Sequence, residues 1–181
     1  MNQATEAVCR WAQEGEALSP PSWGELPNIP LYMDQVILYL KDSLRFFERD
    51  EDASLLTSSM INNYVKSGLI AHPEKKKYSK EHLGALMVIC ILKQVLSIQD
   101  VKTLLAGETL SEELYQLFLE AHVSAVQETC RSLSENCRKE QELKEEALRL
   151  AVEANAKRAA AERILYELGR EKGESSANKG K

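Results

Sequence analysis

Residues 57–79 read TSSMINNYVKSGLIAHPEKKKYS, and the expected architecture is built outward from them. Thr57 or Ser58 is the expected N-cap of a short helix, and Gly68 is a natural residue just beyond its C-terminus. After Gly68, Pro73 turns the chain and Tyr78 returns to the core, so we predict a small β-hairpin or loop. The apolar side chains of the helix recur at the spacing of one face: they are Met60, Ile61, Tyr64 and Val65.

The chain before this stretch predicts a longer helix and an extended segment. Four of the five prolines fall within residues 20–30, where Trp23, Leu26 and Ile29 are expected to pack as a strap. Residues 3–14 can form an amphipathic helix of up to three turns. From Leu31 to the acidic run at 50–52, apolar residues at 3.6-residue spacing indicate a core-facing helix: they are Val36, Ile37, Leu40, Leu44 and Phe47.

The chain after the stretch predicts helices only. Ser79 is the expected cap of a helix that runs through Gln94. Ser97, with Asp100 three residues later, forms a variant capping box for a helix over 98–106 that Gly107 ends. Ser111 is expected to cap the last element. Because glycine is absent from residues 108–168, this element should be a long helix.

Charge is distributed unevenly along the chain, although the net charge of −5 gives no hint of a nucleic-acid partner. Residues 57–82 carry five basic and two acidic side chains, whereas residues 1–56 carry four and ten. Lysine, hydroxyl and amide side chains hold phosphates, and Asn reads base edges. A solvated turn whose lysines serve solubility is the alternative. The candidate DNA-binding residues are Thr57, Ser58, Ser59, Asn62, Asn63, Tyr64, Lys66, Lys75, Lys76, Lys77, Tyr78 and Lys80.

The order of these elements is that of a winged helix-turn-helix domain. Residues 62–70, NNYVKSGLI, resemble the R-Y-Y-E-x-x-G-L-[IL] signature of MerR-type regulators, and residues 78–83, YSKEHL, resemble their Y-S-E-E-D-L. Residues 92–102, LKQVLSIQDVK, are similar to their L-x-x-L-G-F-S-L-E-E-I-K. This resemblance implies that the helix from Thr57 to Ser67 enters the major groove of DNA while a wing holds the backbone.

A second resemblance is to an uncharacterised bacterial family, the domain of unknown function 1836. Its L-P-x-I-P-L-Y-M-D-Q, T-x-x-M-I-N-N-Y-V-K and K-K-K-Y elements are similar to residues 26–33 and 57–78, and the likeness extends over about residues 26–130. It implies a DNA-binding regulator. The chain departs from the MerR pattern in two places: Asn62 stands where the pattern has an Arg, and the wing lacks Gly-Tyr-Arg. Both departures weaken the expected binding of phosphates.

MerR-type proteins dimerise through a long C-terminal helix, and residues 107–170 are the corresponding candidate here. The apolar stripe contains a six-residue step where seven is needed, which predicts a break near Glu140. A lone solvated helix is the alternative, but so few buried groups would hardly keep it ordered, which favours a partner helix. The predicted dimerisation residues are Leu133, Leu143, Ala147, Leu150, Ala154, Ala161, Ile164 and Leu168. Residues 171–181 are expected to be a disordered tail.

The sequence lacks the marks of an enzyme. It contains no G-x-S-x-G, P-loop or G-x-G-x-x-G motif, and its four Cys and three His lack zinc-ligand spacing. The longest apolar stretch, residues 84–92, is too short to cross a bilayer. We expect a mostly α, MerR-like winged helix-turn-helix domain at 31–106, after an N-terminal helix and strap at 1–30.

We expect a cytoplasmic protein that acts in transcriptional control. It is expected to be a homodimer that binds duplex DNA, with no metal, no cofactor and no small-molecule effector domain. The alternative is a protein-interaction adaptor that uses the same fold and the long C-terminal helix without binding DNA. In that case the acidic segments on either side of residues 57–82 would dominate its surface.

Overall fold

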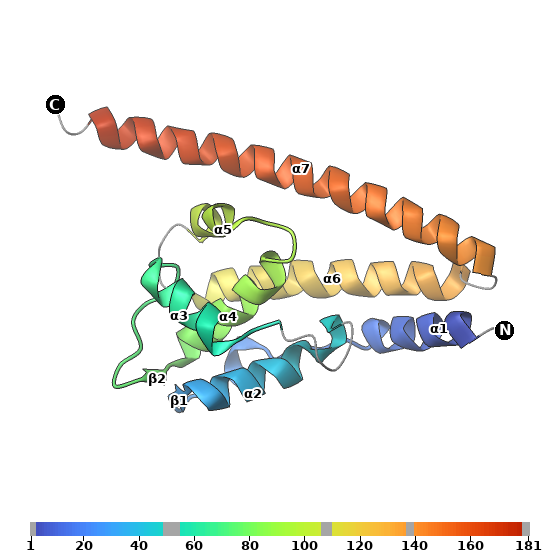
Figure 1. The fold of residues 1–181 in the computed structure, drawn as a ribbon, viewed down its shortest axis with the longest axis horizontal. Coiled ribbons are helices and arrows are strands. Elements are labelled where there is room, and N and C mark those ends of the chain that lie inside the picture. The colour runs from blue at the N-terminus through green and yellow to red at the C-terminus, as the bar shows by residue number, and fades with distance from the viewer. Residues whose placement is uncertain (1–2, 49–54, 106–109, 137–139, 179–181) are drawn as a thin grey trace.

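The computed structural model describes residues 3–48, 55–105, 110–136 and 140–178, and this part of the chain is mostly helical, as predicted (Figure 1). The elements are α1 (Gln3–Glu16), η1 (Trp23–Glu25), β1 (Leu31–Tyr32), α2 (Met33–Leu44), η2 (Arg45–Phe47), α3 (Ser58–Lys66), β2 (Lys77–Tyr78), α4 (Lys80–Leu92), α5 (Ile98–Leu104), α6 (Glu112–Asn136) and α7 (Glu140–Asn178). We call the unit from β1 to α5 the body and α7 the arm.

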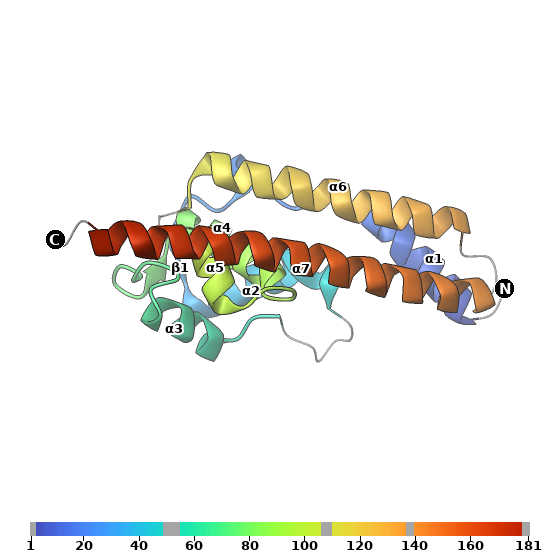
Figure 2. The same ribbon diagram turned by 90° about the horizontal axis from the view of Figure 1, so that it is seen from above.

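Helix α4 is the centre of the body. Its side chains from Leu83 to Cys90 are all buried, and no charged residue falls between Leu83 and Leu92. A helix that is apolar on every side must be surrounded by other elements. Here α2 packs on it through Val36 and Leu40, which are fully buried. This arrangement leaves α3 on the outside of the body, where one of its faces meets solvent (Figure 2).

The predicted boundaries of α3 are confirmed at atomic level, whereas α4 ends at Leu92, two residues before the predicted Gln94. The Thr57 hydroxyl accepts a hydrogen bond from the Met60 amide at 3.3 Å, so Thr57 is the N-cap of α3. Gly68 follows its C-terminus with φ of +67°, a conformation that costs glycine little. The Leu69 amide donates to Tyr64 O at 2.9 Å and the Gly68 amide to Val65 O at 3.0 Å, which is the Schellman pattern.

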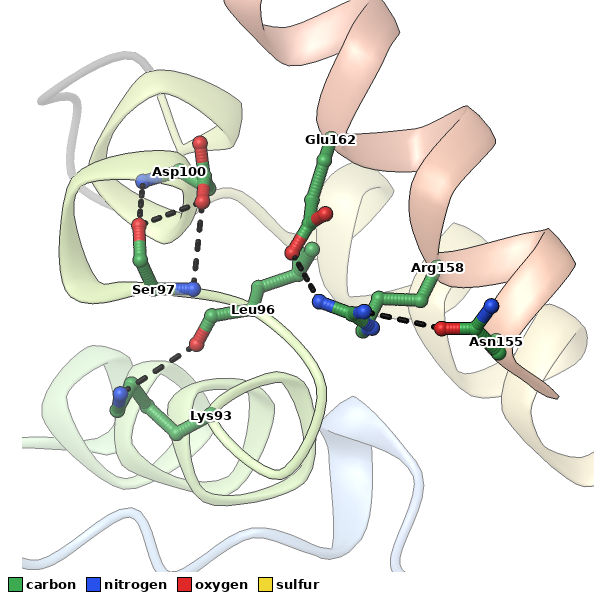
Figure 3. A network of polar contacts seen from close by, with 7 residues as sticks. All are labelled: Lys93, Leu96, Ser97, Asp100, Asn155, Arg158 and Glu162. Atoms are coloured by element: carbon green, nitrogen blue, oxygen red, sulfur yellow. Dashed lines mark hydrogen bonds and ion pairs between the residues drawn. The ribbon is translucent and has the colours of Figure 1, made fainter. Parts of the chain in front are cut away.

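The capping boxes further along the chain also form as predicted. Asp100 donates its amide to the Ser97 hydroxyl at 3.1 Å, and its carboxylate accepts the Ser97 amide at 3.3 Å (Figure 3). Ser111 accepts the Leu114 amide at 3.2 Å and so caps α6. The predicted end of α5 at Gly107 lies outside the described residues. Helix α2 was expected to run to the acidic residues 50–52, but it ends at Leu44 and passes into a 3-10 turn, Arg45–Phe47, after which Glu48 is extended.

The predicted hairpin is smaller than a conventional wing. β2 pairs antiparallel with β1, with Leu31 opposite Tyr78 and Tyr32 opposite Lys77. Lys77 also bridges Glu74 through a two-residue turn, in which Lys77 donates its amide to Glu74 O at 2.8 Å. Lys75 and Lys76 form this turn with φ of 48° and 64°, the signature of type I′. We call residues 74–77 the lysine turn.

The strap before the body is confirmed in part. Leu26 is buried, and Trp23 packs against Tyr115 of α6 with ring centroids 5.5 Å apart. Gly84 permits this approach, because a Cβ there would lie 3.1 Å from Trp23 and 2.9 Å from Leu110. Ile29 was expected to pack with them but is 71% exposed.

Beyond the body, α6 and the arm are separate helices that run in opposite directions (Figures 1 and 2), so the predicted break near Glu140 is confirmed. α1 packs along α6, where Ala12, Cys130 and Leu133 form a second small core. The arm crosses the body at α5, and Arg158 and Glu162 lie beside the turn that leads into α5 (Figure 3).

The fold divides the predicted dimerisation stripe. Leu133 and Leu143 belong to the small core with α1, and Ala161 packs on the main core, so these residues are used within the chain. Leu150 is half-buried. The helix also continues to Asn178, eight residues into the segment expected to be a disordered tail. The remaining residues of the stripe are exposed: they are Ala147, Ala154, Ile164 and Leu168.

No helix in the described part of the chain combines the length and the apolar character that a membrane span requires.

Candidate nucleic-acid interface

One face of α3 is polar and open to solvent. The hydrophobic side chains of the helix, Ile61, Tyr64 and Val65, point into the body and are at most 8% exposed. The polar residues recur at i, i+1, i+4, i+5 and i+8, which places them together on the opposite side. All of them are exposed: they are Ser58, Ser59, Asn62, Asn63 and Lys66, with Thr57 at the start of the helix.

The lysine turn lies at the same end of the molecule as α3. Figures 1 and 2 both place the loop from α3 to β2 beside this helix. Lys75, Lys76 and Lys77 are all exposed. The Lys77 ammonium lies 5.0 Å from the centre of the Tyr32 ring, a cation–π contact that favours an outward position along β1. Ammonium groups held this way are suited to phosphate oxygens.

The C-terminal end of α3 and the loop that follows it are held by two side chains that were not among the predicted DNA-binding residues. At its C-terminus, Lys102 of α5 donates from Nζ to Ser67 O at 3.0 Å, which places a positive charge at the negative end of the helix dipole. In the following loop, His82 Nε2 lies 3.2 Å from Ala71 O, while its Nδ1 accepts the Ser79 amide at 3.1 Å. His82 therefore ties the exit of α3 to the start of α4.

Three of the predicted DNA-binding residues do not belong to this surface. Tyr64 and Tyr78 are each 2% exposed, and burial raises the pKa of both phenols. Their rings complete the core under α3 and β2, because an aromatic ring at an inward position contributes a large buried area. Lys80 points toward the strap, where its Nζ donates to Asn28 Oδ1 at 3.3 Å and lies 5.2 Å from the Trp23 ring centre.

The surface that remains combines hydroxyl, amide and ammonium groups. Its only carboxylate among the described residues 57–78 is that of Glu74, against four lysines. We call it the polar face: Thr57, Ser58, Ser59, Asn62, Asn63, Lys66, Lys75, Lys76 and Lys77. Among the residues that the structure describes, no group of three or more His, Cys, Asp or Glu side chains is placed to hold a metal ion.

Comparison with protein families identifies one match, which covers residues 21–122 and is described as a domain of unknown function, DUF1836. The match extends over more than half of the chain, so the chain belongs to this family. It includes the strap, the body and the first part of α6 but not the arm. Searches of curated proteins and of solved structures give no match.

Proposed function

We propose that this member of the DUF1836 family binds duplex DNA in transcriptional control, with a MerR-like winged helix-turn-helix as its DNA-binding unit. α3 acts as the recognition helix and the lysine turn as a short wing. The observation that carries the proposal is the polar face: its side chains on α3 are all exposed, and its three exposed lysines belong to the loop that runs beside α3 (Figures 1 and 2). A helix of this kind enters the major groove while neighbouring cations hold the backbone.

Each group of the polar face has a role that matches its chemistry. Asn62 and Asn63 lie at the middle of α3, and an Asn amide forms paired hydrogen bonds to the N6 and N7 edge of adenine. Ser58 and Ser59 lie in the first turn, where hydroxyls reach bases or phosphates. Lys66 and the lysine turn contact phosphates, which gives affinity without sequence preference.

The proposal includes a homodimer formed through the arm. Between residues 141 and 170 of α7, four large apolar side chains are 57–67% exposed: Leu148, Val152, Ile164 and Tyr166. In the same part of the arm Leu165 is buried, and Leu143 and Ala161 pack on the cores. Residues 140–153 carry five acidic and two basic side chains, and residues 154–170 carry two and four. An antiparallel pair of arms therefore sets the acidic half of each against the basic half of the other.

A protein-interaction adaptor is the second candidate, and the same exposed apolar residues of the arm favour it. An adaptor would use Leu148 and Val152 to hold a different protein, and the polar face would serve only solubility. The two candidates differ in whether the protein binds DNA at all, so a direct binding measurement separates them.

The test is fluorescence anisotropy on random and genomic-pool duplex DNA over a range of salt concentrations. Each phosphate contact contributes about −0.9 to the slope of log affinity against log salt. The triple variant Lys75, Lys76, Lys77→Ala should flatten this slope by about two to three units. The matched control, Arg10, Lys41, Arg131→Ala, removes the same charge from exposed positions on α1, α2 and α6, outside the polar face and the arm, and should leave most of the slope intact.

A second measurement asks whether α3 reads sequence. Selection from a random duplex library with the wild type should enrich a motif, and the Asn62, Asn63→Ala variant should lose about 1–3 kcal/mol of discrimination at adenine positions while it retains its salt slope. Absence of binding by the folded protein at low salt would refute the DNA-binding function and leave the adaptor. Equal slopes for the two triple variants would refute the wing.

A further inference from the structure

A pocket of about 450 Å³ lies directly behind α3. Its walls come from three parts of the body: the end of α3 with the loop to residue 72, the first turns of α4, and the end of α5. Six of its lining residues are apolar and only 5–8% exposed, and we call them the pocket floor: Val65, Leu69, Ile70, Ala85, Leu105 and Leu110.

The size and lining of this pocket are those of a small-molecule site. Pockets that bind ligands measure about 300–1,000 Å³ and combine an apolar lining with a few polar groups. The polar groups of the lining here are those of Lys66, His72, Ser79, Glu81 and His82.

The polar groups of the pocket have most of their hydrogen-bonding capacity already committed. The Ser79 hydroxyl donates to Glu81 Oε2 at 2.5 Å, and this hydrogen bond lowers the pKa of the Glu81 carboxyl. Both ring nitrogens of His82 are engaged, with the Ser79 amide and with Ala71 O. The exposed side chains of Lys66 and His72 remain at the rim. The charges of Lys66 and Glu81 oppose each other, so the lining offers no unbalanced charge to an ion.

From these features we infer that the pocket binds a small, neutral, largely apolar molecule with a single hydrogen-bonding group directed at the rim near His72. An ion would lose its hydration shell over the pocket floor without gaining a counter-charge, and that transfer is costly. A neutral ring system loses little hydration free energy in the pocket and gains van der Waals contacts with the floor residues.

The location of the pocket gives such a ligand a regulatory role. The bound molecule touches Val65 and Lys66 at the end of α3 and also Leu69 to His72, which lead to the lysine turn. It therefore contacts the end of α3, which is proposed to read DNA, and the segment that leads from α3 to the lysine turn. This regulatory consequence rests on the proposed function, whereas ligand binding itself does not.

The test uses the full chain and three fluorinated probes that share one ring system: neutral 5-fluoroindole, cationic 5-fluorotryptamine and anionic 5-fluoroindole-3-acetate. Binding is followed by fluorine NMR titration. We expect saturable binding of 5-fluoroindole, and binding of both charged probes that is at least about tenfold weaker. The assay contains no DNA, so its failure would leave the DNA-binding proposal standing, and the reverse also holds.

Two variants locate the probe. Ala85→Phe places a ring on the pocket floor, and Ala71→Trp fills the pocket from its exposed rim, so the second still tests the site if the first destabilises α4. Each variant should lower the affinity for 5-fluoroindole at least about tenfold. Ala156→Phe, at an exposed position on the arm, is the matched control and should change nothing. The inference is overturned if the folded wild type does not bind, if both filling variants still bind, or if a charged probe binds as tightly as the neutral one.

Discussion

The body and the arm are both helical but are held in place by different forces. In the body, α4 is covered on every side, and core residues such as Val36, Leu40 and Leu86 are fully buried. In the arm, Leu165 is the one large side chain described as buried between residues 140 and 170. The arm is lined instead with exposed ion pairs along the helix, each worth a few tenths of a kcal/mol: they include Arg158–Glu162 at 2.8 Å and Arg163–Glu167 at 2.7 Å. A packed core specifies one structure, whereas the position and order of a solvated helix depend on the element or partner that it packs against.

The largest expected effect is in the body. Leu86→Ala removes a fully buried side chain from the middle of α4 and should lower the free energy of unfolding by about 3 kcal/mol, because the cavity cannot collapse around a central helix. Urea denaturation followed by circular dichroism measures this. Leu38→Ala, on α2 at 70% exposure, is the control and should change the free energy by less than about 0.5 kcal/mol. Equal effects of the two variants would mean that α4 is not the centre of the core.

A smaller effect is expected at Gly15, where α1 meets α6 outside the body. A Cβ on Gly15 would lie 2.3 Å from Cys130 Sγ and 2.7 Å from the Phe46 ring, so Gly15→Ala forces α1 away from α6. We expect a loss of about 2 kcal/mol, typical of overpacking, and faster amide hydrogen exchange in α1. Gly24→Ala is the control, since nothing lies within 4 Å of its Cβ position. Unchanged exchange in α1 would show that this contact is not tight in solution.

The arm should respond more weakly still. Leu165→Ala removes its buried anchor, but the arm can detach from α5 without unfolding the body, so the cost is limited to the energy of docking. We expect about 1 kcal/mol, together with faster hydrogen exchange over residues 154–170 and unchanged exchange in α4. Leu148→Ala, at 67% exposure, should leave the exchange of the monomer unchanged. A cost equal to that of Leu86→Ala would show that body and arm unfold as one unit.

The difference between body and arm also explains what the sequence predicted well. Boundaries in the body and at the start of α6 are marked locally. The hydroxyls of Thr57, Ser97 and Ser111 each accept a cap hydrogen bond from an amide three residues later, and Gly68 takes the positive-φ conformation that ends α3. Such signals need no knowledge of tertiary structure. The break before the arm was also predictable, because a change in the phase of an apolar stripe is a local property.

The errors arose where a residue's partner is distant in sequence. Tyr64 and Tyr78 carry the same functional groups whether they hold a phosphate or fill a core, and only the packing of α4 beneath them decides. Lys80 belongs to the basic run but is drawn to Asn28, 52 residues earlier. On the arm, the predicted dimerisation stripe included Ile164 but not Leu165, although Leu165 is the buried one of the two. In an alanine-rich helix the spacing of apolar residues does not show which of two neighbours is buried, because that depends on the contact with α5. For the same reason Lys102 gave no signal as a support of α3.

The smallest expected effect has the opposite sign and sharpens the interpretation of the polar face. Lys75 and Lys76 hold positive φ values that Asn and Gly adopt more easily, so Lys75→Asn with Lys76→Gly should stabilise the body by about 1 kcal/mol. Thermal denaturation measures this gain. Because the variant keeps the turn and removes two charges, its salt slope for DNA should flatten by about 1.8 if both lysines touch phosphates. A gain in stability with an unchanged slope would mean that the lysines were never at the DNA. A loss in stability would mean that the type I′ turn is not formed in solution, because Asn and Gly favour that turn more than two lysines do.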